Sequence, residues 1–255
     1  MSLKMGLLGR KVGMTQMFWD DGTALGCTVL ELGPCVVTDV RSADKHGYSA
    51  VQLGFGAKPD RLLNRPEQGR LKAIQSKAGE GVKVESFPRT VRELRLDAAD
   101  ASKYAVGSVL SAKDVFKAGD VVDITATSKG KGYQGVMKLH HMAGFRSTHG
   151  VHEFYRHGGS IGCRLTPGRV HKGKRMSGRM GNNTCTTSNL VIVKVLEDEN
   201  VVIVKGSVPG AANGLIMVKG SAKNVVRHAV KREVKETESK NPMKASKKGA
   251  PAKKK

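Results

Sequence analysis

The stretch Leu190–Lys205, LVIVKVLEDENVVIVK, contains two short runs of Val, Ile and Leu separated by an acidic turn. Such β-branched runs, bounded by Glu, Asp and Asn, are typical of neighbouring strands. They predict strands over Leu190–Leu196 and Val201–Lys205, with a third over Leu215–Lys219 (LIMVK). The fold class is therefore predicted to be mainly β.

The first sixty residues repeat this pattern, with turn residues about every ten positions, which predicts an antiparallel sheet or barrel. The predicted strands there are Gly13–Phe18, Thr23–Leu32, Cys35–Val40 and Tyr48–Phe55. The chain becomes polar after Lys58, and a proline suited to a first helical position predicts a short helix over Pro66–Lys77. Apolar and polar residues nearly alternate again over Ser86–Leu96. The pattern predicts one more strand over Gly119–Thr127.

Segment 127–183 interrupts this pattern between two predicted strands. It holds twelve glycines, eleven Lys or Arg residues and a single acid, Glu153. No apolar period of 2 or 3.6 residues is sustained in it, so neither a core strand nor an amphipathic helix accounts for it. Structureless segments of this length are usually functional or disordered. Since strands flank it, one β-domain is expected to be completed by sequence-distant halves.

The net charge of +22 is concentrated in two places. Segment 127–183 carries +10 and residues 231–255 carry +7, whereas 1–126 carries +3 and 184–230 carries +2. Charge of this kind attracts polyanions, which leaves nucleic acid or an anionic membrane as the leading partner class. A membrane is disfavoured because no apolar anchor or amphipathic helix accompanies the charged segment. The 4% aromatic content argues against an aromatic stacking sheet as the main binding mode.

Two apparent catalytic motifs in the basic segment lack the context that their chemistry needs. Residues 158–162 (GGSIG) match a nucleophile elbow, which requires an entering strand and a leaving helix. Residues 168–174 (GRVHKGK) match a phosphate-binding loop, but Arg175 follows where a hydroxyl would bind Mg²⁺. We therefore predict no catalytic residue and no enzymatic activity, and no small-molecule substrate.

Histidines cluster in the same segment, at His140, His141, His149, His152 and His157, with Cys163 beyond them. Structural zinc sites use tighter paired spacings, and second-shell carboxylates are scarce here, so neither a metal site nor a cofactor is predicted. The other cysteines, Cys27, Cys35 and Cys185, form no CxxC pair. Reduced thiols and the lack of a secretory apolar core at the start predict a cytoplasmic protein.

The remaining interpretation is RNA binding by the basic segment itself. Lys and Arg would contact phosphates, glycines would allow close approach, and histidines and Arg planes would stack on bases or hydrogen-bond to them and to 2′-hydroxyls. The predicted RNA-binding residues are Lys129, Lys131, Lys138, Arg146, His149, His152, Arg156, His157, Arg164, Arg169, Lys172, Lys174, Arg175 and Arg179.

Several motifs closely resemble the bacterial large ribosomal subunit protein L-three family. They are Gly6–Gln16 (GLLGRKVGMTQ), Asp123–Ser128, Gly130–Lys138 (GKGYQGVMK), His149-Gly150, Gly159–Gly162, Thr166–Val170, Lys172–Met176, Gly181-Asn182, Val204–Gly206 and Val208–Gly210. The resemblance extends over about residues 4–220. It implies a translation-protein-type β-barrel with a small α/β insert, and a long extended basic loop that threads large-subunit ribosomal RNA toward the peptidyl transferase centre.

The resemblance also implies a role and partners. The family member would be a structural constituent of the large subunit in the cytoplasm, an early assembly protein that binds near the 3′ region of the RNA, with L-fourteen and L-nineteen as neighbours. Its loop tip would fall near Arg146–Cys163, and Thr166–Arg179 would form the returning arm. A stand-alone RNA-binding chaperone is the alternative function.

With this resemblance, the chain divides into five parts: a first barrel part (1–57), an α/β insert with a return strand (58–126), the RNA-penetrating loop (127–183), a second barrel part (184–220) and a basic tail (221–255). Val226, Val230 and Val234 predict a helix in the tail before a disordered end. Two positions depart from the family. Leu139 stands where Arg is usual, and Leu165 stands where some members carry a methylated glutamine.

Overall fold

The structure, a computed structural model, describes residues 4–19, 22–77 and 86–223. Six of its strands close into a barrel in the order β1-β12-β7-β10-β11-β2, with every neighbouring pair antiparallel. They are β1 (Gly6–Phe18), β2 (Ala24–Leu32), β7 (Val121–Thr127), β10 (Thr184–Leu196), β11 (Val201–Lys205) and β12 (Leu215–Gly220). The mainly β class predicted from the sequence is confirmed.

The barrel pairs strands from the beginning of the described chain with strands from its end, and their side chains share one buried core. Strand β1 pairs with β12, with Gly6 opposite Lys219, and β2 pairs with β11. Leu7, Ile124 and Ile192, which come from three different strands, are fully buried in one cluster. Each such side chain contributes about 1.5–3 kcal/mol when it leaves water, so the sequence-distant halves hold each other in place.

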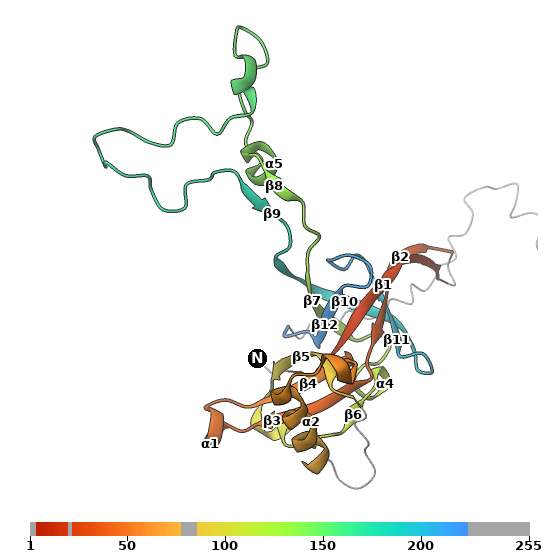
Figure 1. The fold of residues 1–255 in the computed structure, drawn as a ribbon. Coiled ribbons are helices and arrows are strands. Elements are labelled where there is room, and N and C mark those ends of the chain that lie inside the picture. The colour runs from red at the N-terminus through yellow and green to blue at the C-terminus, as the bar shows by residue number, and fades with distance from the viewer. Residues whose placement is uncertain (1–3, 20–21, 78–85, 224–255) are drawn as a thin grey trace, which may run out of the picture.

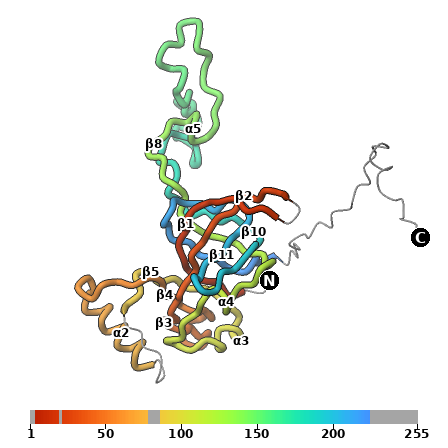
Figure 2. Tube along the Cα trace, turned by 90° about the vertical axis from the view of Figure 1, so that its right-hand side faces the viewer, coloured from red at the N-terminus to blue at the C-terminus, as the bar shows by residue number. Residues whose placement is uncertain are grey.

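A second sheet packs below the barrel (Figures 1 and 2). Its order is β5-β4-β3-β6, formed by β3 (Cys35–Arg41), β4 (Ala50–Ala57), β5 (Pro88–Arg95) and β6 (Val109–Leu110). Helix α2 (Arg65–Lys77) lies against this sheet, as predicted for Pro66–Lys77. Short turns complete this part: α1 (Ala43–His46), η1 (Asp60–Leu62), α3 (Ala98–Ala101) and α4 (Ala112–Val115).

The division of the chain at residue 57 is wrong, because the first barrel part ends with β2 at Leu32. Strands β3 and β4 pair with β5 and β6 instead, and the buried side chains of Val37 and Leu53 share a cluster with Leu94. The sequence pattern predicted β3 and β4 and showed near alternation over β5, but it did not predict β6. It did not predict their partners, since period alone carries no information about which strand lies alongside.

Segment 128–183 leaves the barrel between β7 and β10 and extends away from it, at the end opposite the second sheet (Figures 1 and 2). We call this segment the extended loop. It contains short elements that the sequence did not predict: β8 (Gly132–Gln134), α5 (Val136–His140), η2 (His152–Arg156) and β9 (Gly178–Met180). The predicted tail helix, with Val226, Val230 and Val234, lies outside the described residues. Among those described, each helix is too short or too polar to cross a bilayer.

The two arms of the extended loop lie close together at Gly130 and Gly181, and we call this place the root of the loop. The part of the loop beyond the root can be deleted without a gap in the chain. A Cβ placed on Gly181 would lie 3.0 Å from the Cα of Gly130, so these residues are close enough to be joined directly. Deleting Lys131–Met180 creates a two-residue Gly-Gly turn, which suits a tight hairpin between β7 and β10.

We predict that this deletion variant folds, with a free energy of unfolding within about 1 kcal/mol of the full chain, because the deleted part contributes almost nothing to the barrel core. Urea unfolding, monitored by circular dichroism, measures this free energy. A variant that is unfolded at zero urea would show that the barrel depends on the loop.

Candidate nucleic-acid interface

The two arms of the extended loop are paired at its root. Thr127 on β7 lies opposite Thr184 on β10, and just beyond them the Ser128 amide donates to the Asn183 carbonyl at 2.9 Å. Strands β8 and β9 then continue as a two-stranded ribbon, with Tyr133 opposite Arg179. The loop therefore leaves the barrel as two hydrogen-bonded arms rather than as two independent irregular segments. We call this paired part, residues 128–134 and 178–183, the neck.

Gly181 makes the close approach of the two arms possible. Its φ is +74°, a conformation that L side chains rarely adopt, and a Cβ there would collide with the carbonyl oxygen of Lys129. The adjacent contact is a backbone one: the Lys131 amide donates to the Met180 carbonyl at 2.9 Å. Only glycine fits this position without separating the arms.

Lys11 supports the root from the barrel. Its side chain is only 8% exposed, and its ammonium donates to the carbonyls of Val208 (2.7 Å) and Gly210 (3.4 Å). Burial, and secondly the positive charge of Lys129, lowers the pKa of Lys11. The 208–210 turn that it holds lies against the root, since a Cβ on Gly210 would be 2.9 Å from the Thr127 carbonyl oxygen. No local sequence signal marks Lys11 for this role, because its partners at 208 and 210 are distant in the chain.

Beyond the root, helix α5 packs on the returning arm. A Cβ on Gly178 would lie 3.7 Å from the side chain of Leu139, so this leucine covers the ribbon. The His140 Nε2–H donates to the Met176 carbonyl at 2.9 Å, and the hydroxyls of Tyr133 and Ser177 are 2.6 Å apart. Leu139 thus serves packing.

All fourteen predicted RNA-binding residues are exposed on the extended loop. Lys129, Lys131 and Arg179 lie at the neck, Lys138 on α5, His152 and Arg156 on η2, and the others in irregular backbone of the two excursions seen in Figure 1. None of these cations forms an ion pair within the described ranges, whereas the body pairs Arg10 with Glu31 and Lys58 with Glu67. The loop presents its charge to solvent without internal neutralisation.

The catalytic-looking motifs adopt open, irregular backbone. Ser160 sits in a stretch without an entering strand or a leaving helix, and its Oγ hydrogen-bonds to the backbone of Gly162 at 3.3 Å. Gly168–Lys174 has the same irregular character. Among the described residues, no three His, Cys, Asp or Glu side chains gather in a metal-binding group. Neither motif has the geometry that its chemistry would need.

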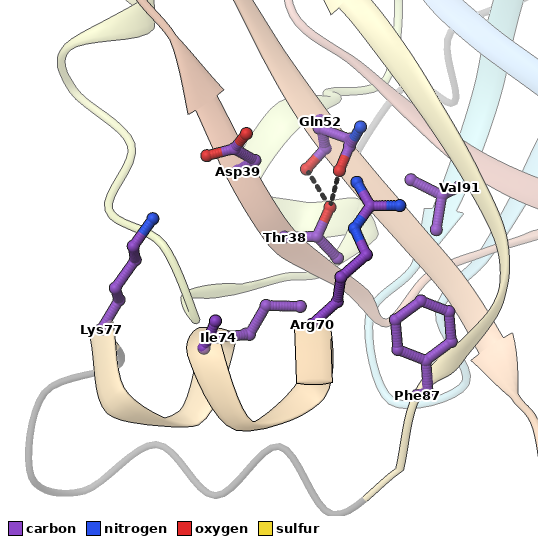
Figure 3. Close-up of a pocket in the computed structure, with 9 residues that line it drawn as sticks. Thr38, Asp39, Gln52, Arg70, Ile74, Lys77, Phe87 and Val91 are labelled. Carbon is purple, nitrogen blue, oxygen red and sulfur yellow. Dashed lines mark hydrogen bonds between the residues drawn. The ribbon is translucent and has the colours of Figure 1, made fainter. Parts of the chain in front are cut away.

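A small cavity of about 110 Å³ lies between α2 and the second sheet (Figure 3). Its polar floor is internally satisfied, because the Thr38 hydroxyl, which lies 2.8 Å from the Gln52 Oε1, also reaches the Gln52 carbonyl. Arg70 and Lys77 line it from the helix and Asp39 from the sheet, so its charges are mixed. The cavity is remote from the extended loop and has no polar group that calls for a ligand.

Comparison with known proteins agrees with the motifs in the sequence. A family model described as ribosomal protein L3 matches residues 90–200. The large ribosomal subunit protein uL3 of Herpetosiphon aurantiacus is 48% identical over 218 residues, covering 86% of this chain and 97% of that protein. The uL3 of Geotalea daltonii is 48% identical with the same coverage, and that of Brachyspira pilosicoli is 44% identical, covering 86% and 94%.

We predict that Gly181→Ala separates the arms of the neck without unfolding the barrel. The Lys131 amide, which donates to Met180, should lose hydrogen-exchange protection by about tenfold or more, because the new methyl meets the Lys129 carbonyl. Gly135→Ala is the matched control, since its φ is −68° and nothing lies within 4 Å of the added Cβ. Equal protection in both variants would show that the neck does not depend on this contact.

Proposed function

The chain belongs to the ribosomal protein L3 family, and on that premise we propose that its extended loop binds large-subunit ribosomal RNA directly. Membership makes the protein a structural constituent of the large ribosomal subunit, active in translation. Its place is then the large subunit in the bacterial cytoplasm. The observation that carries the RNA-binding proposal is the set of exposed cations on the loop, which have no carboxylate partner among the described residues.

The physical role of the loop is charge neutralisation within closely packed RNA. Phosphates of neighbouring RNA segments repel one another, and Lys and Arg side chains placed between them release bound counterions and relieve that repulsion. Twelve glycines in segment 127–183 leave room for backbone amides to approach phosphates or sugars. The paired neck gives the tip a defined direction away from the barrel, so the charge is delivered at a distance from the body.

We extend the proposal to assembly and position. The barrel docks on the RNA surface early, and the loop becomes enclosed as the RNA folds around it toward the peptidyl transferase centre. Loop residues act on peptide transfer only indirectly, by holding RNA geometry, and the protein itself is not an enzyme. We propose proteins of the L-fourteen and L-nineteen families as its protein neighbours, an expectation that rests on the family resemblance in the sequence.

The salt dependence of RNA binding tests the electrostatic mechanism. If the loop neutralises about eight phosphates, log K for a large-subunit RNA fragment should fall with log salt at a slope of roughly −6 to −7. Replacing Lys172, Lys174 and Arg175 with Ala should make the slope shallower by roughly 2–3, since three phosphate contacts are lost.

The matched control replaces three exposed lysines of the body, Lys45, Lys113 and Lys117, with Ala. It removes the same charge but should leave the slope unchanged. An equal change in both triple variants would mean that binding follows net charge and not the loop, and a slope near zero for the wild type would contradict the mechanism altogether.

Deletion of Lys131–Met180 separates docking of the barrel on RNA from maturation of the large subunit. In cells whose sole copy is this variant, the protein should still sediment with early precursor particles, because the barrel is intact, while mature large subunits decline. Sucrose-gradient profiles measure both. In wild-type cells, stoichiometric sedimentation with large subunits is expected, and a large free pool that binds unrelated RNAs equally would favour the stand-alone chaperone.

A further inference from the structure

An aromatic-lined hollow lies at the far end of the extended loop, and we propose that it is a stacking site for one unpaired RNA base. This inference rests on the proposed function, since it specifies what the loop binds besides phosphate. The hollow encloses about 590 Å³ and is open to solvent. Its lining residues are Phe145, Gly150, Val151, Phe154, His157, Gly158 and Gly159.

Backbone contacts between distant parts of the tip build this hollow. The Phe145 amide donates to the Tyr155 carbonyl at 3.0 Å, which brings the two phenylalanines to one place. Gly144 permits this crossing: its φ is +76°, and a Cβ there would be 2.6 Å from the Tyr155 carbonyl oxygen. The hollow is therefore formed in the free protein, so a ligand does not have to order it.

The aromatic rings that line the hollow lie at an angle to one another. Phe154 and His157 meet edge to face, with centroids 4.8 Å apart and an interplanar angle of 69°. A Cβ on Gly159 would lie 3.7 Å from the Cζ atom of Phe145, so this glycine lies beside the ring and adds no side chain to the wall. Flat walls of aromatic and glycine residues suit a planar heterocycle better than a branched aliphatic side chain.

Exposed aromatic rings are concentrated on the loop. Phe145 is 52% exposed and Phe154 is 57% exposed, whereas Phe87 and Phe116 in the body are 7% and 3% exposed, and Phe18 at the end of β1 is the one exposed aromatic residue of the described body, at 66%. Segment 127–183 holds four of the eleven aromatic residues of the chain, all of them more than 40% exposed. Leaving large apolar surface in water is unfavourable, which indicates that a partner covers it.

The charged residues next to the hollow's aromatic residues in the sequence are Arg146, Arg156 and one acid, Glu153, and this net positive charge favours nucleic acid as the partner. Arg146 follows Phe145 in the chain, and Arg156 lies between Tyr155 and His157. Both arginines are exposed, with no ion pair among the described residues. Aromatic residues with neighbouring unpaired cations are how proteins bind unstacked bases while tracking the backbone phosphates. An exposed apolar slot for a protein would not need the surrounding excess of positive charge.

The test compares two twelve-residue RNA probes with the full-length protein: oligoadenylate, and an abasic ribose-phosphate chain of the same charge. At one salt concentration, wild type should bind oligoadenylate about five- to 100-fold more tightly than the abasic probe, which is the range for stacking one base. Both probes should give the same salt slope. Phe154→Ala should abolish the preference and leave the slope unchanged.

Two further variants make the result specific. Leu165→Ala, which removes an apolar side chain that is 87% exposed elsewhere on the loop, should keep the full preference. Phe154→Leu retains apolar volume without a π-face and should lose the preference as Phe154→Ala does. If Phe154→Leu binds like wild type, the hollow serves internal packing and the proposal is overturned.

The outcomes separate this inference from the proposed function. Equal affinity of wild type for both probes, with a steep salt slope, would overturn base stacking and leave RNA binding by the cations intact. If log K does not fall with log salt for either probe, the proposed function itself, RNA binding by the loop cations, is contradicted. Loss of binding to phosphatidylserine vesicles in Phe154→Ala, with base preference unchanged, would assign the hollow to a membrane and would also overturn the proposal.

Discussion

The antiparallel pairing of β7 with β10 is the constraint on which the rest of the molecule depends. Because Thr127 and Thr184 are opposite one another in the barrel wall, the extended loop begins and ends at the same place. A chain of 56 residues carrying a net +10 buries too little apolar surface to fold by itself. Fixing both of its ends to a rigid barrel gives it a direction, and the glycine contact at Gly181 extends the pairing into the neck.

The body and the loop differ in how their cations are paired. In the body, some cations lie near carboxylates or backbone acceptors, as Arg10 does with Glu31 and buried Lys11 does with two carbonyls, while others such as Lys45 are exposed. On the loop, the cations face solvent, and the neck is held by backbone hydrogen bonds and small apolar contacts instead. Such a surface is costly in isolation and favourable only beside a polyanion. The structure of the free protein is thus consistent with a component of a larger RNA assembly.

Much of this fold could be predicted from the sequence. Runs of Val and Ile gave the strands, and the proline before Glu67 gave the helix, because these signals are local. The assignment of β3 and β4 to the barrel failed because strand partners are decided by long-range contacts, here the pairing of β3 with β4 and β6 and of β4 with β5. The charged residues of the loop were identified by composition alone. Lys11 and the aromatic hollow were not, since a buried lysine and a meeting of Phe145 with Phe154 are consequences of three-dimensional contacts.

The central claim is that the extended loop, and not the body, makes the intimate contact with large-subunit RNA. Ultraviolet crosslinking of intact large subunits, followed by mass spectrometry of RNA-linked peptides, tests it most directly. The account predicts that crosslinked peptides concentrate within residues 129–179 and include the aromatic tip, with few from the second sheet and its helices. Crosslinks concentrated on residues 43–117, with the loop peptides recovered free of RNA, would contradict it.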